Sequence, residues 1–326
     1  MHVLVTFPAN DEHKRKLEAL VPDWTLVYAH RLKVTAEDVR PADIILGNVP
    51  IAVLPFATRL SWIQLSSAGA NGYTDPGVLP PKALLTCSSG AFGMAVSEHL
   101  LALLLVLTKN LGIYRDSQSR GEWHRTLPTR TIHGSTILVV GLGDLGGTFA
   151  SHVRSMGAYV IGVRRTVGAK PDCVDELHPA EALDALLPRA DFVAITLPGM
   201  PSTNRMFDAS RIARMKQGAY LLNVGRGSVV DTDALVAALE SGHLAGAGLD
   251  VFEEEPLPSG HRLWQLPQVV LTPHTAGGFQ LPATVESIFD ILVENLVRFR
   301  SGRPLFNLID IKTGNKVVTD DRNRET

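Results

Sequence analysis

A glycine-rich turn at residues 141–146 constrains the fold more than any other segment of this 326-residue chain. It reads Gly141-Leu-Gly-Asp-Leu-Gly146, directly follows an apolar run at residues 136–140 and opens a helix-like segment at residues 147–156. Between a strand and a helix, the first glycine permits the tight turn, the second lets the backbone approach a pyrophosphate, and the third allows close helix–strand contact. The helix amino terminus then offers N–H groups and a positive dipole end to phosphates. The segment predicts a dinucleotide-binding unit; an ordinary tight turn is the alternative.

Apolar runs of strand length alternate with helical patterns on both sides of residue 100, which indicates mainly parallel sheets. In the first part, a helix is expected at residues 11–20 and strands at residues 3–5, 44–46 and 62–65. In the second part, strands are expected at residues 136–140, 159–163, 192–195, 220–224, 247–250 and 269–272.

The connecting segments place the nucleotide-binding domain inside the chain. Residues 95–111 are expected to form one long buried helix, and a second, amphipathic helix is expected from Leu281 to about Arg300. Residues 304–308 are expected to return to the first domain as a short strand. We therefore predict a dinucleotide-binding domain at residues 97–284, inserted into a second domain made of residues 1–96 and 285–326.

Composition argues against several other classes of protein. The formal net charge is only -2, whereas nucleic-acid binding needs a concentrated basic face, so no nucleic-acid partner is expected. Cys87 and Cys173 are too few for a disulfide framework and lack metal-ligand spacing, so we expect a reducing compartment and no metal. The first residues lack a signal-peptide pattern, and the most apolar run, residues 100–107, is far shorter than the roughly 20 residues that span a bilayer. A cytoplasmic protein without a membrane partner is therefore expected.

The end of the next expected strand carries information on cofactor choice. Eighteen residues beyond Gly146 lies Arg164, in the segment Val163-Arg-Arg-Thr166. A site that prefers NAD usually has Asp or Glu there for the ribose hydroxyls, and that acid repels a 2′-phosphate. The guanidinium groups of Arg164 and Arg165 would instead hold a 2′-phosphate through charge-assisted hydrogen bonds. We expect NADP(H) to be favoured over NAD(H); a solvated arginine pair in a surface loop is the alternative.

Three later loops each carry a charged residue at the end of an expected strand. They contain Arg226, Glu255 and His274, and such loops converge because ligands bind beyond the carboxyl ends of parallel strands. Arginine suits a carboxylate, and histidine, with an unperturbed pKa of about 6.5, can protonate a developing alkoxide near working pH. Glu255 can orient the imidazole and favour its protonated form. The set predicts reduction of a 2-keto acid, although each residue alone also fits a structural or solvated position.

These motifs resemble those of the D-isomer-specific 2-hydroxyacid dehydrogenases, a family that includes glyoxylate and hydroxypyruvate reductases, 3-phosphoglycerate dehydrogenase and D-lactate dehydrogenase. The resemblance covers nearly the whole chain and is strongest over residues 134–278. It implies an α/β protein of two doubly wound domains, a Rossmann dinucleotide-binding domain inserted into a flavodoxin-like substrate domain. It also implies a homodimer that transfers a hydride between NAD(P)H and a small 2-keto or D-2-hydroxy acid, of the glyoxylate/hydroxypyruvate type.

The resemblance assigns roles residue by residue. The family's catalytic Arg, Glu and His fall on Arg226, Glu255 and His274, and its nicotinamide-amide-binding Asp falls on Asp250. The implied cofactor contacts are Gly141, Gly143, Asp144, Leu145, Gly146, Arg164, Arg165, Thr166, Thr196, Leu197, Pro198, Val224, Gly225, Arg226, Asp250, His274 and Gly277. The implied substrate contacts are Ala68, Gly69, Ala70, Arg226 and His274.

Some positions keep two interpretations or depart from the family. The loop at residues 67–71 resembles the family's carboxylate-binding loop, with a plain glycine turn as the alternative. Glu98 and His99, near the start of the long helix, would be structural. Trp123 lies where some relatives reach into the neighbouring subunit's site; an ordinary buried aromatic is the alternative. Asp144 stands where many relatives have Arg, so backbone amides are expected to do more of the pyrophosphate binding.

Other functions on the same fold stay open. One is a cofactor-sensing binding protein like the C-terminal-binding corepressors, although the complete Arg–Glu–His set argues against it. Another, within the enzyme class, is 3-phosphoglycerate dehydrogenase, although no surplus basic cluster indicates a phosphate pocket. Formate dehydrogenase is disfavoured because that relative pairs its histidine with Gln, where this chain has Glu255.

Overall fold

The computed structural model describes residues 1–123, 127–166, 168–278, 281–314 and 316–317. The chain divides into two compact units, one formed by Met1–Ala91 and Phe279–Thr326 and the other by Phe92–Gly278. The two domain boundaries expected from the sequence, after residues 96 and 284, lie a few residues later in the chain than the two boundaries of the structure. The first boundary comes earlier in the structure because α3 (Gly93–Thr108) belongs from its first turn to the second unit, where it packs against α5 (Asp144–Ser155) and β11 (Leu244–Leu249).

The first unit contains a parallel sheet with the strand order β2-β1-β3-β4-β5. Its strands are β1 (His2–Val5), β2 (Thr25–Tyr28), β3 (Ile44–Leu46), β4 (Trp62–Gln64) and β5 (Leu84–Thr86). Its helices are α1 (Asp11–Leu20), α2 (Ala36–Val39) and α9 (Pro282–Arg300). This order is the flavodoxin-like one, which confirms the expected fold of this domain.

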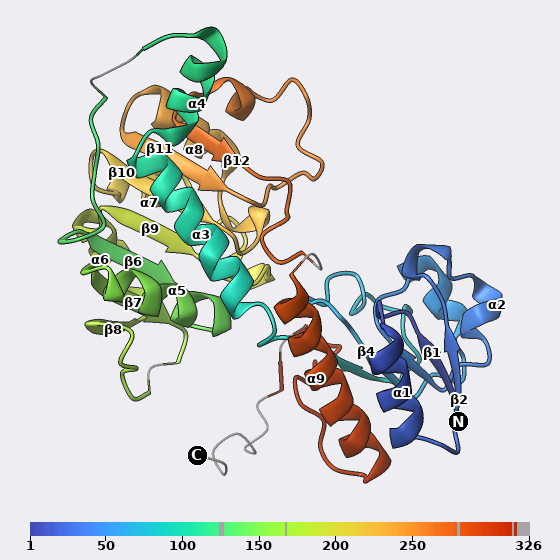
Figure 1. Cartoon of the computed structure of the whole chain (residues 1–326). Helices are drawn as coiled ribbons and strands as arrows, with labels where there is room; N and C mark the ends of the chain where they lie inside the picture. Colours follow the sequence, from blue (N-terminus) through green and yellow to red (C-terminus); the bar gives the residue numbers. More distant parts are fainter. Residues whose placement is uncertain (124–126, 167, 279–280, 315, 318–326) are drawn as a thin grey trace. The chain divides into compact units, whose positions relative to one another are not determined.

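Alternating side chains of this sheet fill a core on each face. Leu4, Ile45 and Ile63 pack on the face that also buries Leu54. On the other face, the ring of Trp62 stacks on Phe299 of α9 at a centroid distance of 5.0 Å, which brings the last long helix back to the first strands, as Figure 1 shows. The expected amphipathic helix is thereby confirmed.

The segment that follows α9 does not form the expected strand. Leu308 makes only an isolated antiparallel bridge to Thr86 of β5. The backbone bends away before it because Asn307 is left-handed, with φ 54°, and because Phe306 donates its N–H to the Asn295 side chain instead of to a strand. Residues 304–308 return to the first domain as expected, but the expectation that they form a strand is wrong.

The second unit contains a parallel sheet with the strand order β12-β11-β10-β9-β6-β7-β8. Its strands are β6 (Thr136–Val140), β7 (Tyr159–Arg164), β8 (Glu176–Pro179), β9 (Phe192–Ile195), β10 (Ala219–Asn223), β11 (Leu244–Leu249) and β12 (Val269–Leu271). The chain runs outward from β6 in one direction and then from β9 in the other, which is the Rossmann arrangement with its ligand crevice where the direction changes.

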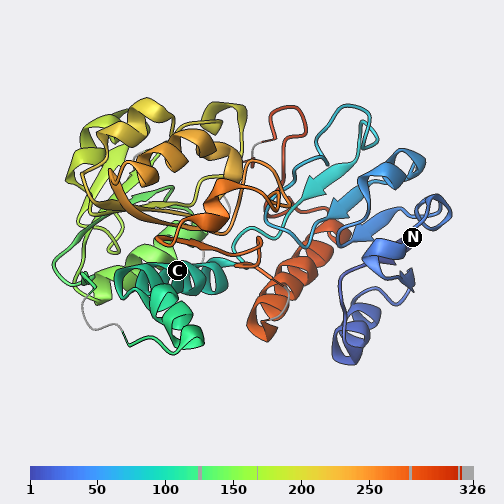
Figure 2. The same ribbon diagram turned by 90° about the horizontal axis from the view of Figure 1, so that it is seen from above.

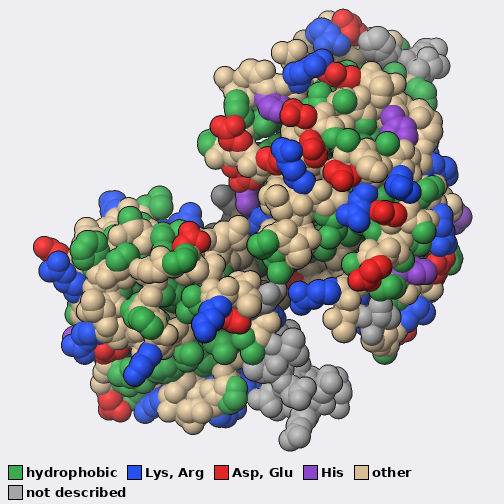
Figure 3. Space-filling view, turned by 180° about the vertical axis from the view of Figure 1, so that it is seen from behind, with side chains coloured by type: hydrophobic (Ala, Val, Ile, Leu, Met, Phe, Trp, Pro, Cys, Tyr) green, Lys and Arg blue, Asp and Glu red, His purple; other side chains and the backbone are tan. Residues whose placement is uncertain are grey.

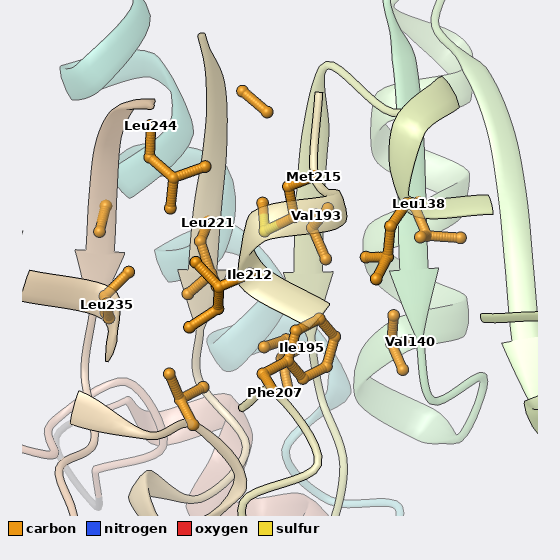
Figure 4. Packing of buried hydrophobic residues seen from close by; sticks show 14 of the residues in the cluster. Leu138, Val140, Val193, Ile195, Phe207, Ile212, Met215, Leu221, Leu235 and Leu244 are labelled. Carbon is orange, nitrogen blue, oxygen red and sulfur yellow. The ribbon is translucent and has the colours of Figure 1, made fainter. Parts of the chain in front are cut away.

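Helices cover both faces of this second sheet, as Figure 2 shows. The helices are α3, α4 (Leu111–Arg120), α5 (Asp144–Ser155), α6 (Leu183–Leu186), α7 (Ala209–Arg214) and α8 (Thr232–Glu240). Strand residues such as Leu138 and Leu221 pack against Ile212 of α7 and Leu235 of α8 (Figure 4). Leu103 and Leu107 of α3 lie over Gly248 on the opposite face. The core therefore fixes the carboxyl ends of β6, β9, β10, β11 and β12 at one edge.

The long helix expected at residues 95–111 is divided in two. Helix α3 ends at Thr108 and α4 begins at Leu111, with a bend of 63° between them. The break falls at Asn110, whose φ of 55° is left-handed, a conformation that Asn tolerates better than most residues. No single helix among the described residues has the length and apolarity to cross a bilayer, although this bent pair passes together by length and composition alone.

Charged side chains of both signs are interspersed on the face shown in Figure 3. This distribution agrees with the near-neutral balance of 31 basic and 33 acidic residues.

Candidate functional site

The glycine turn after β6 has the geometry that the sequence predicts. Gly141 has a φ of +105° and donates its N–H to Val163 of β7 over 2.9 Å. A Cβ on Gly146 would stand 1.9 Å from the carbonyl oxygen of Gly141, so no larger residue fits there. A Cβ on Gly143 would meet nothing within 4 Å. Gly141 is thus required by its φ and Gly146 by a backbone contact, and Gly143 leaves open space at the start of a helix.

Helix α5 begins at this open space without a side-chain cap. Gly143 is its N-cap residue, and no side chain accepts from the first turn, whose N–H groups have no acceptor within the helix. Asp144 places its carboxylate beside the first residue of α3, where a Cβ on Gly93 would lie 2.4 Å from the Asp144 Oδ1. A helix amino terminus stabilises such a negative charge. The carboxylate of Asp144 therefore lies next to the start of α3, and its backbone remains part of the α5 terminus.

The loops after β9 and β10 adjoin the glycine turn. Thr196 donates its hydroxyl to the carbonyl oxygen of Gly141 over 2.5 Å. A Cβ on Gly225 would lie 2.5 Å from the carbonyl oxygen of Leu197. Pro198 accepts a hydrogen bond from the Thr203 hydroxyl. The loop after β9 is thus bonded to the glycine turn, and the loop after β10 approaches it at a position that only glycine allows.

The basic pair follows β7, the neighbour of β6. Arg164 donates from Nη2 to the carbonyl oxygen of Ala169 over 3.1 Å. Its Nε is buried and has no hydrogen-bond partner within the described parts of the chain. Arg165 and Thr166 are exposed. At the end of β7, the Arg164 guanidinium is therefore bonded to the following loop through Nη2 and has an unpartnered Nε, and the Arg165 side chain is exposed.

The loop that carries Arg226 is held by a buried asparagine. Asn223, at the end of β10, is 1% exposed. Its amide donates to the carbonyl oxygen of Arg226 over 3.0 Å, and its side-chain oxygen accepts from the N–H of Gly225. Arg226 in turn donates from Nη1 to the Gly225 carbonyl oxygen over 2.7 Å. A role for Asn223 was not expected from the sequence, because its effect depends on the turn that it closes.

The Arg226 loop packs directly on the loop that carries Glu255. A Cβ on Gly227 would stand 1.8 Å from the carbonyl carbon of Phe252. The Phe252 N–H donates to Glu255 Oε1 over 3.0 Å. Burial lowers the pKa of the Arg226 guanidinium, and the charge of Glu255 acts in the opposite direction. The cation and the carboxylate are therefore close enough to interact electrostatically in a partly buried setting.

Glu255 also contacts His274. The distance between Glu255 Oε2 and His274 Nδ1 is 2.7 Å. Because a carboxylate only accepts hydrogen bonds, Nδ1 carries the proton that is shared with Glu255. Nε2 is then the ring atom available for exchange with a ligand. The imidazole is about half exposed, with a side-chain exposure of 46%.

His274 has an uncommon backbone conformation. Its φ is +49°, a left-handed value that carries strain for a residue other than glycine. Its N–H donates to the carbonyl oxygen of Asp250 over 2.8 Å. The Asp250 carboxylate, whose side chain is 2% exposed, accepts from the N–H groups of Thr275 and Ala276 and from the hydroxyl of Thr272. Asp250 therefore fixes the loop that presents the imidazole.

The remaining predicted residues have varied surroundings. A Cβ on Gly277 would contact the ring of Phe92 at 3.2 Å, so this glycine packs on the start of the second unit. Val224 is buried, and Leu145 is partly buried in the first turn of α5. Trp123 is 85% exposed, so the interpretation as an ordinary buried aromatic is wrong for this chain.

Among the described residues, no group of His, Cys, Asp and Glu side chains could hold a metal ion.

The first unit contains the loop at residues 67–71. Ala68 is exposed, and Gly69 and Ala70 are partly buried. Asn48 organises the loop, because its side-chain oxygen accepts from the N–H groups of Ser66 and Ser67. The Ser67 hydroxyl then donates to the carbonyl oxygen of Gly69 over 2.7 Å. The loop is thus held by more hydrogen bonds than a plain glycine turn needs.

Known proteins resemble the chain over most of its length. Residues 101–276 match the D-isomer specific 2-hydroxyacid dehydrogenase, NAD binding domain. A glyoxylate reductase of Thermofilum pendens is 32% identical over 79% of this chain and 77% of its own.

Two solved structures share the whole fold. A D-isomer specific 2-hydroxyacid dehydrogenase of Xanthobacter autotrophicus, in complex with NADPH and MES, has a TM-score of 0.79 and 30% identity, over 96% of this chain and 99% of its own. An NADPH-dependent glyoxylate/hydroxypyruvate reductase of Sinorhizobium meliloti, in complex with NADP and sulfate, has a TM-score of 0.79 and 27% identity over the same shares. With the glycine turn and the Arg–Glu–His loops described above, these matches show that the chain belongs to the NAD(P)-dependent D-isomer specific 2-hydroxyacid dehydrogenases.

Proposed function

We propose that this protein reduces a small 2-keto acid to the D-2-hydroxy acid, as a reductase of the glyoxylate/hydroxypyruvate type. The observation that carries the proposal is the 2.7 Å contact between Glu255 Oε2 and His274 Nδ1. That contact leaves a histidine Nε2 free for proton transfer in the same unit as the glycine turn and Arg226. The names of similar proteins, among them glyoxylate reductase and glycerate dehydrogenase, support the substrate class.

The three side chains divide the work of the reaction. Arg226 binds the substrate carboxylate, because its planar fork matches two oxygens, and its partial burial strengthens that interaction. Protonated His274 delivers the Nε2 proton to the carbonyl oxygen, and neutral His274 takes a proton from the hydroxyl in the reverse direction. Glu255 keeps the ring in orientation and stabilises the imidazolium. The reduced nicotinamide, when bound, supplies the hydride.

The glycine turn suits a dinucleotide. The open space at Gly143 and the uncapped start of α5 fit a pyrophosphate, which the N–H groups of Gly143, Asp144 and Leu145 would hold. Asp144 directs its charge toward α3, so the backbone supplies the binding. The residues that would line the rest of the cofactor site are Gly141, Gly146, Thr196, Leu197, Pro198, Val224, Gly225, Asp250 and Gly277.

NADP(H) is the favoured cofactor in this proposal. Arg164 has a buried Nε without a partner among the described residues, and Arg165 and Thr166 are exposed next to it. Arg164, Arg165 and Thr166 would together hold the 2′-phosphate of NADP(H). The sequence at the end of β7 has no Asp or Glu that would repel this phosphate. Similar proteins crystallised with NADPH or NADP support this choice.

The backbone amides of Ala68, Gly69 and Ala70, in the loop that Asn48 organises, would bind the substrate carboxylate. The family resemblance favours a homodimer, in which the exposed Trp123 would face the neighbouring subunit. The presence of only two cysteines in 326 residues favours the cytoplasm.

A keto-acid panel tests the proposal. The oxidation of NADPH and of NADH is followed at 340 nm with glyoxylate, hydroxypyruvate, pyruvate and longer 2-keto acids, and the product is separated on a chiral column. We expect turnover of at least one short keto acid, faster with NADPH, and only the D-isomer from substrates that give a chiral product. No turnover of any keto acid with either cofactor, or an L-product, would contradict the proposed function.

A further inference from the structure

A partly buried chain of hydrogen bonds runs from α3 to the loop that carries His274. His99 lies in the second turn of α3, and its Nε2 is 2.9 Å from the Thr272 hydroxyl oxygen. Thr272 follows β12, and its Oγ1 is 2.6 Å from Asp250 Oδ1. The side chains of His99 and Asp250 are 23% and 2% exposed. Helix and loop are therefore joined by side chains that water reaches poorly.

The chemistry of the groups fixes the direction of these bonds. The Asp250 carboxylate only accepts, so the Thr272 hydroxyl donates its single proton to it. The Thr272 oxygen must then accept from His99, which places a proton on the His99 Nε2. The chain of hydrogen bonds is therefore complete only if the His99 Nε2 is a donor.

This chain of hydrogen bonds ends at the backbone of His274. Asp250 accepts the His274 N–H at its carbonyl oxygen and the N–H groups of Thr275 and Ala276 at its carboxylate. These bonds hold His274 at a φ of +49°, which a residue with a side chain adopts only under constraint. Without the Thr272 hydroxyl, the Asp250 carboxylate would keep only its two amide hydrogen bonds and would be held less firmly. The conformation of His274 is therefore held in part by the side chains of Thr272 and Asp250, which bond to each other and to the backbone of the next two residues.

We propose that His99 is a positioning residue: through Thr272 and Asp250 it fixes the backbone of His274 and hence the place of its imidazole. This inference rests on the proposed catalytic role of His274, and it gives a functional task to a residue that was expected to be structural.

Paired variants test the inference. His99→Leu and Thr272→Val remove the donor and the hydroxyl relay, and His99→Gln and Thr272→Ser keep them, because the glutamine amide can occupy the place of Nε2. The matched control is His243→Leu, since His243 is also partly buried with two hydrogen bonds, to Gln217 and to the Ile212 carbonyl oxygen, before the start of β11.

The readouts are kcat, the KM for NADPH and the keto acid, the urea midpoint, and hydrogen exchange of the amides at 274–276. We expect His99→Leu and Thr272→Val to lower kcat and to accelerate exchange at 274–276 by about tenfold, the effect of one hydrogen bond. His99→Gln and Thr272→Ser should keep most of the kcat. His243→Leu should shift the urea midpoint without changing kcat or the exchange at 274–276.

Two results overturn the inference: a kcat and an exchange rate in Thr272→Val equal to those of the wild type, or equal losses in His99→Leu and His243→Leu. If His99→Leu does not fold, the Thr272→Val and Thr272→Ser pair decides alone. If the wild type reduces no keto acid, the proposed function fails, and the exchange measurement still decides whether His99 holds the loop.

Discussion

Glu255 and His274 are nineteen residues apart in the chain, and their side chains meet at 2.7 Å between Oε2 and Nδ1. They meet because β11 and β12 are adjacent parallel strands, with Leu249 paired to Leu271, so the loops that follow them leave the same edge of the sheet. The pair lets the Nε2 of His274 carry a proton while the ring is held from its other side.

The charge of Glu255 can be removed without changing the size of the side chain. Glu255→Gln should lower kcat by about tenfold to a hundredfold, because a hydrogen bond to a charged group is worth about 1.5–3 kcal/mol. The KM for NADPH should not change. Steady-state kinetics with a saturating keto acid measures the effect, and Glu254→Gln, at an exposed neighbouring position, is the control. Equal kcat values for the two variants would show that Glu255 does not support His274.

The fork of Arg226 should matter beyond its charge. Arg226→Lys keeps the cation and loses the planar pair of donors, as well as the bond to the Gly225 carbonyl oxygen. We expect the KM for the keto acid to rise about tenfold or more, since a bidentate charge-assisted contact is lost. Arg214→Lys, exposed on α7, should leave it unchanged. An unaltered KM in Arg226→Lys would remove this residue from substrate binding.

The basic pair after β7 should select the cofactor. Replacing Arg164 and Arg165 together by alanine should lower kcat/KM with NADPH by about tenfold to a hundredfold, because two charge-assisted bonds to the 2′-phosphate are lost. The value with NADH should stay near that of the wild type, so each preparation contains its own control. A loss of the same size with both cofactors would contradict the assignment of the pair to the 2′-phosphate.

The edge strand β8 offers a test of stability against pH. Glu176 binds the guanidinium of Arg189 and the imidazole of His178, and these contacts lower the pKa of its carboxyl to about 2 from 4.5. Because the folded-state pKa is lowered, the stabilisation is fully present above pH 4.5 and is lost as the pH falls toward 2. In this partly exposed setting, Glu176→Gln should lower the free energy of unfolding at pH 7 by about 1 kcal/mol or less.

Urea unfolding of Glu176→Gln and of the wild type at pH 7, 5 and 3 measures that difference. The difference in the free energy of unfolding between the two proteins should be similar at pH 7 and 5 and smaller at pH 3. Glu181→Gln, at an exposed position, serves as the control and should show no gap. A gap that stays the same down to pH 3 would mean that the Glu176 charge does not stabilise the fold.

The elements that the sequence predicted are those with a strong local pattern. The continuous apolar runs of β6 and β9 and the helix of α1 were all expected within a residue or two. The strands that were missed are β2, β5 and β8. Of these, β8 reads Glu-Leu-His-Pro and lies at the sheet edge, where charges replace the apolar pattern of a central strand. Its pairing is recognisable only once β7 is in place.

The residues that support the site were harder to predict than the residues that would react. Arg226 and His274 lie in motifs whose chemistry is visible in the sequence. Asn223 and Thr272 act by closing a turn and by bridging two side chains, and a short polar residue with such a role has no pattern of its own. The need for glycine at 227 arises likewise from the backbone of Phe252, which a linear sequence does not place there.

The reduction of the preferred keto acid by His274→Ala, measured beside NADPH binding by the same preparation, tests the central claim most directly. Loss of the proton donor should lower kcat by about 10²–10⁴-fold, and the dissociation constant for NADPH should stay close to the wild-type value. A His274→Ala enzyme that binds NADPH and turns over at nearly the wild-type rate would show that the reaction does not depend on this imidazole.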